Sequence, residues 1–487
     1  MDTKWQPDLS DFDGPKYLAL AHRLRHAVRS GELPEGTRLP PVRDLAWRMG
    51  VTPGTVSRAY QMVTQEGLLE AAVGRGTFVA SMRPSFGATQ PLLTDSVGIF
   101  ARPKGDDPGI VDLRSPQLPE VGQGAAIAAV LARMAAAPDL DVLGYPGLRR
   151  DEGLRAALVD WLSERDLGAI SAEDIVLTQG GQAGIVLALQ CCLRGARPHV
   201  ICEELAYPGF RHAARLNRAE VVAVPMDGDG LSVSALDTAC RQTGARIVTI
   251  TTEAQNPTTA RMTLARRQEI VEVARRHDLQ IIEDDCYSVG RSDLPLLRAL
   301  APERVWHVTS ISKSLAAGLR FGCIVCPTDL RKAVPHDDIF RNDDYGEAGR
   351  LAAQHSYFGL PRPVTEIVKA LMLSGEAARL RDKVQAVFDR RLELALNALG
   401  SFDISWQRGL AFVWLRLPQG WRASTFAREA EAAGILIRSA DEYALVDGRA
   451  PNAVRLAFNG ALDEGLFADA MARLARLLRN PPGDLPV

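Results

Sequence analysis

The chain has 487 residues, of which 46% are hydrophobic and 24% charged, with a formal net charge of −2. This length suits two or three domains with sizeable cores rather than one domain. No apolar run reaches membrane-spanning length and the N-terminus lacks the apolar segment of a signal peptide, so we expect a cytoplasmic protein with no membrane partner. Its seven cysteines are then expected to be reduced. Cys323 and Cys326 lie in a predicted strand, where they point to opposite faces, so we predict no metal site.

The first predicted domain, residues 1–80, combines three helices with a hairpin. Apolar residues recur at helical spacing from Tyr17 to Val28, and Gly31 follows as a stop signal. A second helix is predicted from Val42 to Met49, ended by Gly50, and a third begins at Pro53 with Thr52 as its cap. Residues 68–80 form the hairpin pattern. Residues 15–80 carry nine Lys/Arg and five acids, a charge of +4 that leaves −6 elsewhere, which favours a polyanion partner.

This stretch resembles the GntR-type winged helix-turn-helix domain. The motifs are Leu-Pro-Pro-Val-Arg-Asp-Leu-Ala at 39–46 and Gly-Arg-Gly-Thr-Phe-Val at 74–79. The resemblance implies a double-stranded DNA operator as partner, with phosphate contacts from Arg43 and Arg75. It places four residues at or near the major groove: Thr52, Thr55, Ser57 and Arg58. Pro53 stands where the family often has arginine, so the operator preference does not transfer.

Residues 81–110 are predicted to be a linker. Prolines and glycines recur there without a sustained period, which is typical of a tether. Such a tether allows the DNA-binding domain of one chain to sit over the large domain of a partner chain.

Residues 111–487 alternate helical patterns with short apolar strands, which predicts an α/β domain with a mostly parallel sheet. Seven strands are expected, beginning near residues 174, 199, 219, 246, 280, 305 and 321. The residues with chemical potential fall at or just after strand ends, where open α/β sheets bind ligands. Lys313 lies between small hydroxyl residues and Arg320, a set suited to an aldehyde cofactor that carries a phosphate.

Other strand ends supply groups for a planar, phosphorylated ring. The glycine-rich turn at 178–183 opens a helix and offers backbone N–H groups to a phosphate. Tyr207 could stack on the ring, and Asn256 and Tyr287 could reach its hydroxyl. Asp284 could face a pyridine nitrogen, keeping the nitrogen protonated and the ring an electron sink.

Residues 111–480 resemble the fold-type I aminotransferases that depend on pyridoxal 5′-phosphate. By this resemblance Lys313 is the Schiff-base lysine, Asp284 the pyridinium partner, and Tyr207 the stacking ring. Asn256 and Tyr287 contact the ring hydroxyl. The phosphate is assigned to Gly181, Gln182, Ser310, Ser312 and Arg320. Tyr145 matches a tyrosine that reaches the neighbouring subunit's phosphate, which implies a homodimer, and Arg455 matches the arginine that binds a substrate's α-carboxylate. Thr259 and Arg408 stand where this family often has glycine.

The order of winged helix, linker and aminotransferase-like domain resembles the MocR branch of the GntR regulators. The resemblance implies a transcriptional regulator that senses an amino compound, or pyridoxal phosphate itself, through the aldimine at Lys313. A second hypothesis is an active aminotransferase with an attached DNA-binding module, because fold alone does not decide function. A third is a sensor of pyridoxal phosphate with no amino ligand, which the presence of Arg455 disfavours.

Overall fold

The computed structural model describes residues 5–9, 15–65, 68–72, 76–80, 110–137, 144, 151–195, 198–287, 291–328, 359–445 and 450–481. The chain folds into two compact units, residues 1–97 and 98–487. Of the predicted linker, only Ile110 is among the described residues. Arg75 and Tyr145 also lie outside the described residues. No described helix is long and apolar enough to cross a membrane.

The N-terminal unit is a winged helix-turn-helix. Its elements are α1 (Lys16–Arg29), α2 (Val42–Met49), α3 (Pro53–Gln65) and the antiparallel strands β1 (Leu69–Ala72) and β2 (Gly76–Val79). Gly50 ends α2 with φ of 61°, a left-handed conformation that suits glycine. Thr52 Oγ1 accepts a hydrogen bond from Thr55 N at 3.2 Å where α3 begins. These two helix ends are the ones that the sequence predicted.

A small apolar core holds the three helices together. They contribute fully buried side chains such as Leu20, Leu24, Leu45, Val56 and Val63. The sequence did not predict a further strand-like contact, in which Arg38 forms an antiparallel bridge with Phe78 of β2. This bridge joins the wing to the segment that precedes α2.

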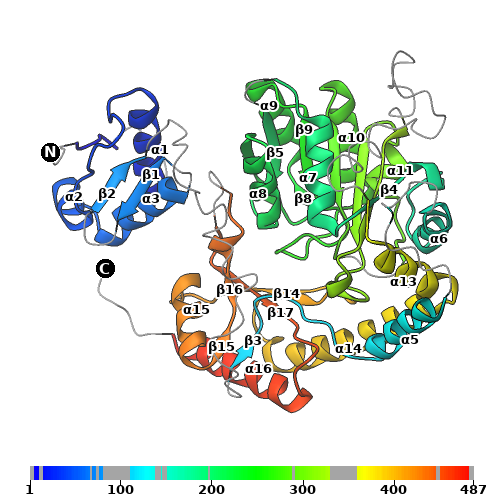
Figure 1. Cartoon of the computed structure of the whole chain (residues 1–487). Helices are drawn as coiled ribbons and strands as arrows, with labels where there is room; N and C mark the ends of the chain where they lie inside the picture. Colours follow the sequence, from blue (N-terminus) through cyan, green and yellow to red (C-terminus); the bar gives the residue numbers. More distant parts are fainter. Residues whose placement is uncertain are drawn as a thin grey trace. The chain divides into compact units, whose positions relative to one another are not determined.

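The second unit is built on a seven-stranded sheet (Figure 1). In sheet order its strands are β4 (Ile175–Thr178), β12 (Gly322–Val325), β11 (Val305–Ser310), β10 (Gln280–Asp284), β9 (Ile247–Ile250), β5 (His199–Glu203) and β6 (Glu220–Val224). β12 runs antiparallel to both of its neighbours, whereas β6, β5, β9, β10 and β11 pair in parallel. The mostly parallel sheet is confirmed, and the reversal of β12 is the feature that the sequence did not predict.

Helices cover both faces of this sheet, which explains why its strands are apolar throughout. On β5, Val200 and Cys202 pack toward α7 (Gly181–Cys192) and α8 (Pro208–Leu216). Ile201 points the other way, toward α9 (Val233–Thr243), α10 (Leu264–Arg276) and α11 (Leu297–Leu300). Near β4 that second face is covered by α5 (Gln123–Ala136), α6 (Glu152–Leu162) and α13 (Arg362–Leu373).

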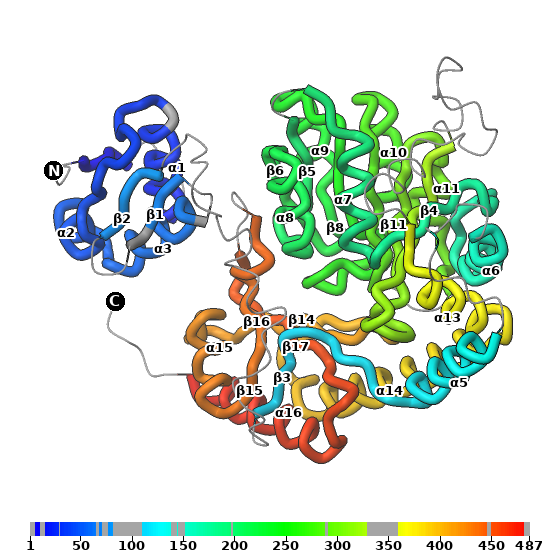
Figure 2. Tube along the Cα trace, viewed as in Figure 1, coloured from blue at the N-terminus to red at the C-terminus, as the bar shows by residue number. Residues whose placement is uncertain are grey.

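The C-terminal part of this unit contains a second sheet that the sequence did not predict. Its four antiparallel strands are β13 (Ile404–Ser405), β14 (Phe412–Arg416), β17 (Ala453–Ala457) and β16 (Arg438–Ser439). The helices α14 (Glu376–Leu399), α15 (Ala423–Ala432) and α16 (Glu464–Arg479) pack with it around one core. The strand β3 (Val111–Asp112) joins this part by pairing with β15 (Ile435–Leu436), as the cyan trace in Figure 2 shows.

Candidate functional site

The predicted cofactor residues gather at one edge of the large sheet, where its parallel strands end. Gly181 begins α7 after β4, Tyr207 precedes α8 after β5, and Asp284 is the last residue of β10. Ser310 ends β11, and Arg320 lies just before β12, which starts at this edge because it runs antiparallel. This is the edge at which open α/β sheets bind ligands.

The turn that leads into α7 forms a cradle of hydrogen-bond donors. A Cβ atom on Gly181 would lie 2.2 Å from Cys286 Sγ, so a side chain here would displace its neighbours. Arg320 reaches this turn, because its Nη2 donates to the carbonyl oxygen of Gln179 at 3.3 Å. Ser312 is buried, and its Oγ has no hydrogen-bond partner among the described residues. A helix N-terminus beside an arginine and an unpartnered hydroxyl suits a phosphate group.

Asp284 is a buried carboxyl group, with 7% of its surface exposed. Burial raises the pKa of Asp284 above the ordinary value, although Cys286 N donates to its Oδ1 at 3.0 Å. A cation placed against this carboxyl group would favour its ionised form. The protonated nitrogen of a pyridine ring is a cation of this kind.

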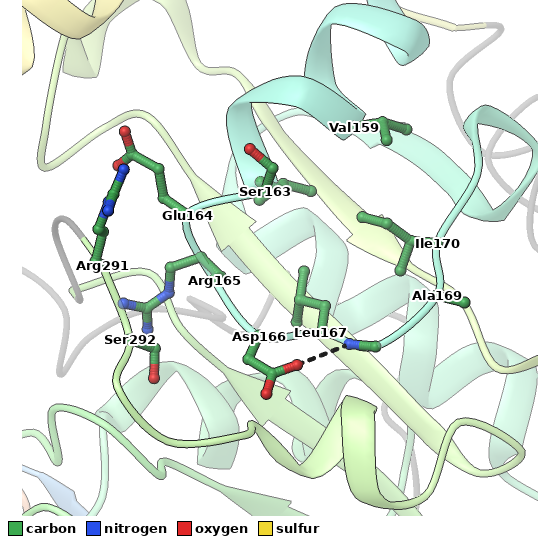
Figure 3. Close-up of a pocket in the computed structure, with 12 residues that line it drawn as sticks. Val159, Ser163, Glu164, Arg165, Asp166, Leu167, Ala169, Ile170, Arg291 and Ser292 are labelled. Atoms are coloured by element: carbon green, nitrogen blue, oxygen red, sulfur yellow. Dashed lines mark hydrogen bonds between the residues drawn. The ribbon is translucent and has the colours of Figure 1, made fainter.

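Further ionisable groups lie behind Asp284. His307 Nδ1 is 3.1 Å from Glu283 Oε2, and its Nε2 is 3.7 Å from Asp285 Oδ2. Arg165 forms a bidentate pair with Asp285, at 2.7 and 3.0 Å. Arg165 also lines a cavity of about 730 Å³ formed by residues 159, 162–170, 291 and 292 (Figure 3). None of the predicted site residues that the structure describes lines this cavity, so it is distinct from the candidate cofactor site.

Tyr207 and Gln182 approach each other at Gly209. Gln182 Nε2 donates to the Gly209 carbonyl at 3.0 Å, and a Cβ atom on Gly209 would lie 2.1 Å from both Gln182 Oε1 and a ring carbon of Tyr207. Burial raises the pKa of Tyr207, and the nearby Tyr287 and Asp284 raise it further. Tyr207 therefore presents a neutral ring beside Asp284, where a planar cofactor could stack.

Lys313, Tyr287, Asn256 and Arg455 form the other side of the site. Lys313 is half-buried, and its Nζ lies 5.6 Å from the centre of the Tyr287 ring. Arg455 is 3% exposed and donates from Nη1 to Asn256 Oδ1 at 2.7 Å. Asn256 Nδ2 is buried and has no partner in the described part of the chain. The NH₂ group of the amide, with its two N–H donors, is therefore available to a ligand.

In the N-terminal unit, the side chains of α3 divide between core and solvent. Arg58 is exposed and lies over the ring of Tyr17 at 4.1 Å, while Thr55 and Ser57 are half-buried at the flanks of the exposed face. Thr52 is exposed at the start of α3, and Arg43 is exposed on α2. Gln61 is also exposed, one turn after Arg58 on the same face of α3, and the sequence did not single it out.

Comparisons with known proteins agree with both units. Residues 16–79 match the family of bacterial regulatory proteins called gntR, and residues 110–474 match aminotransferase class I and II. The probable rhizopine catabolism regulatory protein MocR of Rhizobium meliloti is 30% identical over 338 residues, covering 66% of this chain and 67% of the relative. The chain belongs to the MocR-type branch of the GntR transcriptional regulators. TauR of Rhodobacter capsulatus, an HTH-type transcriptional regulator, is 29% identical over 507 residues, 95% of this chain and 97% of the relative.

The larger unit of this MocR-type regulator is also similar to solved aminotransferases. LysN of Thermus thermophilus, an alpha-aminoadipate aminotransferase solved with N-(5′-phosphopyridoxyl)-L-leucine, is 25% identical with a TM-score of 0.64. The similarity covers 76% of this chain and 92% of LysN. The fold is therefore that of enzymes which use pyridoxal phosphate, joined to a DNA-binding domain.

The two residues that stand where aminotransferases often have glycine, Thr259 and Arg408, lie in neighbouring segments. Thr259 has φ of 64°, a left-handed conformation that β-branched residues rarely adopt. Its carbonyl accepts a hydrogen bond from Gln407 Nε2, and Gln407 directly precedes the exposed Arg408. Both residues thus lie where the turn after β9 meets the loop before β14.

Proposed function

We propose that this regulator binds pyridoxal 5′-phosphate at Lys313 and changes its DNA binding when a small amino compound occupies the same site. Bound pyridoxal phosphate supplies an aldehyde that reacts with amines and a ring that withdraws electrons. One observation carries the proposal. Around the half-buried Lys313, two buried donors, Ser312 Oγ and Asn256 Nδ2, have no partner among the described residues. Buried donors of this kind are costly unless a ligand accepts from them.

The residues of the site each have a proposed role. Lys313 bonds covalently to the cofactor, Asp284 accepts the hydrogen bond of the ring nitrogen, and Tyr207 covers one face of the ring. Asn256 and Tyr287 donate to the ring hydroxyl. The phosphate is held by Gly181, Gln182, Ser310, Ser312 and Arg320. The burial of Asp284 and the position of Arg320 beside the N-terminus of α7 support these roles.

Arg455 is proposed to bind the carboxylate of the effector. Within the described ranges, no carboxylate lies at ion-pair distance from its guanidinium group, although the residue is 3% exposed. A buried cation without a partner charge is unfavourable, so an anionic ligand is the expected partner. This supports an amino compound that also carries an anionic group.

We further propose that the regulator acts as a homodimer, with Tyr145 reaching the partner chain's phosphate site. The operator is double-stranded DNA, contacted through Arg43, Thr52, Thr55, Ser57, Arg58 and Arg75. An effector alters DNA binding only if it binds one conformational state of the dimer better than another. Light scattering of the purified protein tests the dimer, and a monomeric mass would contradict it.

An active aminotransferase with an attached DNA-binding module is the second candidate. The 2-aminoadipate transaminase of Thermus thermophilus is 27% identical over 340 residues, 67% of this chain and 79% of that enzyme. The predicted groups for cofactor and carboxylate binding are present in this chain. Sustained conversion of a keto acid to an amino acid would favour this candidate over the regulator that only senses its ligand.

The first test compares wild-type protein with Lys313→Ala and with Lys383→Ala, a change of an exposed lysine on α14. Each protein is incubated with pyridoxal phosphate, freed of excess cofactor, and examined by visible absorbance. We expect a bound-cofactor band in the wild type and in Lys383→Ala, and its loss in Lys313→Ala with an unchanged circular dichroism spectrum. An equal band in all three proteins would contradict the role of Lys313.

The second test follows the same band during titration with amino acids and simple amines, with and without an α-keto acid. DNA affinity is measured in parallel by fluorescence anisotropy, using a duplex that the protein selects from a random library. A spectral change that shifts DNA affinity without keto-acid turnover supports the sensing proposal. A spectral change with no effect on DNA affinity contradicts it.

A further inference from the structure

Two arginines face each other across neighbouring strands at the edge of the candidate site. Arg438 of β16 is the antiparallel register partner of Arg455 of β17. Both donate to the same acceptor, the carbonyl oxygen of Arg114: Arg438 Nε at 3.1 Å and Arg455 Nη2 at 2.7 Å. The two guanidinium groups therefore converge on one point. They are 7% and 3% exposed, so solvent screens their charges little.

In the described part of the chain, the carboxylates near these arginines leave one positive charge unmatched. Glu442 pairs with Nη1 of Arg438, and Asp112 pairs with Arg114 at 2.8 Å. Among the described residues, the acceptors that Arg455 meets are neutral: Asn256 Oδ1, the Arg114 carbonyl and the Tyr287 hydroxyl. Its guanidinium lies between two aromatic rings, 5.2 Å from the centre of Phe412 and 5.0 Å from that of Tyr443. Stacking of this kind stabilises a cation but does not neutralise its charge.

Three donors in this cluster lack a hydrogen-bond partner in the described part of the chain: Tyr443 Oη, Arg438 Nη2 and Arg455 Nε. Tyr443 is 2% exposed, and burial raises its pKa while the charges of Arg455 and Arg438 oppose the rise. The hydroxyl is therefore a neutral donor close to both guanidinium groups. A carboxylate can accept several hydrogen bonds at once and would satisfy donors of all three residues.

A purely structural role for the Tyr443 hydroxyl does not account for these observations. The backbone of Tyr443 already links the two sheets, because its carbonyl accepts from Ala206 N at 3.0 Å. Its ring packs in a small cluster with Leu205 and Trp414. Phenylalanine could make these contacts equally well. A buried hydroxyl without a partner destabilises the folded protein unless a ligand pairs with it.

We propose that Tyr443 and Arg438 complete, with Arg455, an anion-binding subsite for the carboxylate of the effector. This inference rests on the proposed function and narrows it. The effector is then an amino acid and not a simple amine. In this proposal Tyr443 and Arg438 are ligand-binding residues, and Phe412 positions Arg455 by packing its ring against the guanidinium group.

The experiment uses two stable adducts that differ by one carboxylate. The first is N-(5′-phosphopyridoxyl)-L-leucine, and the second is N-(5′-phosphopyridoxyl)-3-methylbutylamine, which lacks the carboxylate. Calorimetric titration of the cofactor-free full-length protein measures the Kd of each. Wild-type protein should bind the first adduct more tightly. Tyr443→Phe should weaken that binding by about tenfold, the effect of one hydrogen bond to a charged group, and should leave the second adduct within about twofold.

Thermal unfolding without ligand gives an independent readout. Tyr443→Phe should melt at the same temperature as the wild type or higher, because it removes an unpaired buried hydroxyl. Arg438→Lys should also weaken only the carboxylate adduct, since lysine cannot reproduce the planar donor fork.

Other outcomes would overturn the inference and separate it from the proposed function. Equal Kd values of the wild type for the two adducts would contradict the proposed carboxylate subsite but not the proposed cofactor site. The same would follow if Tyr443→Phe kept the wild-type ratio of the two Kd values. A lower melting temperature with equal losses for both adducts would make Tyr443 a structural residue. Failure of the wild type to bind either adduct would overturn the proposed function and this inference with it.

Discussion

Glu283→Gln provides a sharp test of how the strand that carries Asp284 is held. Glu283 is fully buried on β10, and each of its carboxylate oxygens meets two donors. Oε1 accepts from Thr252 Oγ1 at 2.8 Å and from Leu297 N at 3.0 Å. Oε2 accepts from Arg298 N at 3.3 Å and lies 3.1 Å from His307 Nδ1. Glutamine replaces one oxygen with an NH₂ group. The Thr252 hydroxyl and His307 Nδ1 can accept as well as donate, but Leu297 N and Arg298 N can only donate. In either orientation of the amide, one backbone N–H and the amide N–H that faces it therefore lack an acceptor.

The expected cost follows from this geometry. Each buried donor left without an acceptor costs roughly 1–3 kcal/mol, so two of them cost about 4 kcal/mol. Residues 98–487 form the affected unit. An unfolding entropy of about 2.1 cal/mol/K per residue then gives a decrease in Tm of roughly 5 °C.

Glu203→Gln is the matched control, because Glu203 is also buried at the end of a strand of the same sheet. Its Oε2 accepts from Gln255 Nε2 at 3.3 Å, whereas Oε1 has no partner among the residues described. Because burial raises the pKa of Glu203 to about 8, the carboxyl group is protonated at pH 5, and the glutamine amide replaces a neutral group whose OH already lacks an acceptor among the described residues. We expect Glu203→Gln to change the Tm by less than about 1 °C at pH 5.

Differential scanning calorimetry of both variants and the wild type measures the effect. The account predicts a clear decrease in Tm for Glu283→Gln and almost none for Glu203→Gln. A Glu283→Gln protein that melts within about 1 °C of the wild type would refute the hydrogen-bond argument, since it would show that the network tolerates an unpaired donor.

Three further predictions concern pH, DNA and the N-terminal unit. Burial raises the pKa of Glu203 to about 8 from the ordinary 4.5. The stability that the protonated carboxyl group contributes is therefore fully present below pH 4.5 and is lost as pH rises through 8. The Tm of Glu203→Gln relative to that of the wild type should increase between pH 5 and pH 8.5, and a constant difference would contradict this. Arg43→Ala should make the plot of log DNA affinity against log salt concentration less steep by about 0.9, whereas a change of the exposed Arg422 to alanine should leave the slope unchanged. Equal slopes for Arg43→Ala and the wild type would exclude a phosphate contact from Arg43. Tyr60→Phe removes a buried hydrogen bond to the Pro40 carbonyl at 2.9 Å and should lower the free energy of unfolding by about 1 kcal/mol. Hydrogen exchange in α2 should then be roughly fivefold faster, and unchanged exchange would show that the bond contributes little.

The sequence predicted the large sheet because its strands are short apolar runs between turn residues. Ile175–Thr178 and His199–Glu203 are buried on both faces, and such runs are visible without knowledge of the fold. The direction of β12 was not predictable, because the apolar pattern of Gly322–Val325 is the same for a parallel and an antiparallel strand. The strands β13 and β16 were missed because each has two residues, too few to show a period.

The residues of the candidate site likewise divide into those that the local sequence indicates and those that it does not. Lys313 and Asp284 were predicted as cofactor residues because they follow or end recognisable strands. Arg438 and Tyr443, which we propose as ligand-binding residues, were not predicted, because their positions depend on the long-range pairing of Arg438 with Arg455. Nothing in the local sequence reports that pairing, or that the carbonyl of Arg114 lies between the two guanidinium groups.

Reductive trapping shows whether Lys313 holds pyridoxal phosphate covalently, as we propose. The protein is incubated with pyridoxal phosphate, reduced with borohydride, digested and mapped by mass spectrometry. The account predicts one phosphopyridoxyl group per chain on the peptide that contains Lys313, and a loss of labelling after prior incubation with an amino acid that the protein senses. Labelling spread over exposed lysines, with Lys313 unmodified, would contradict it.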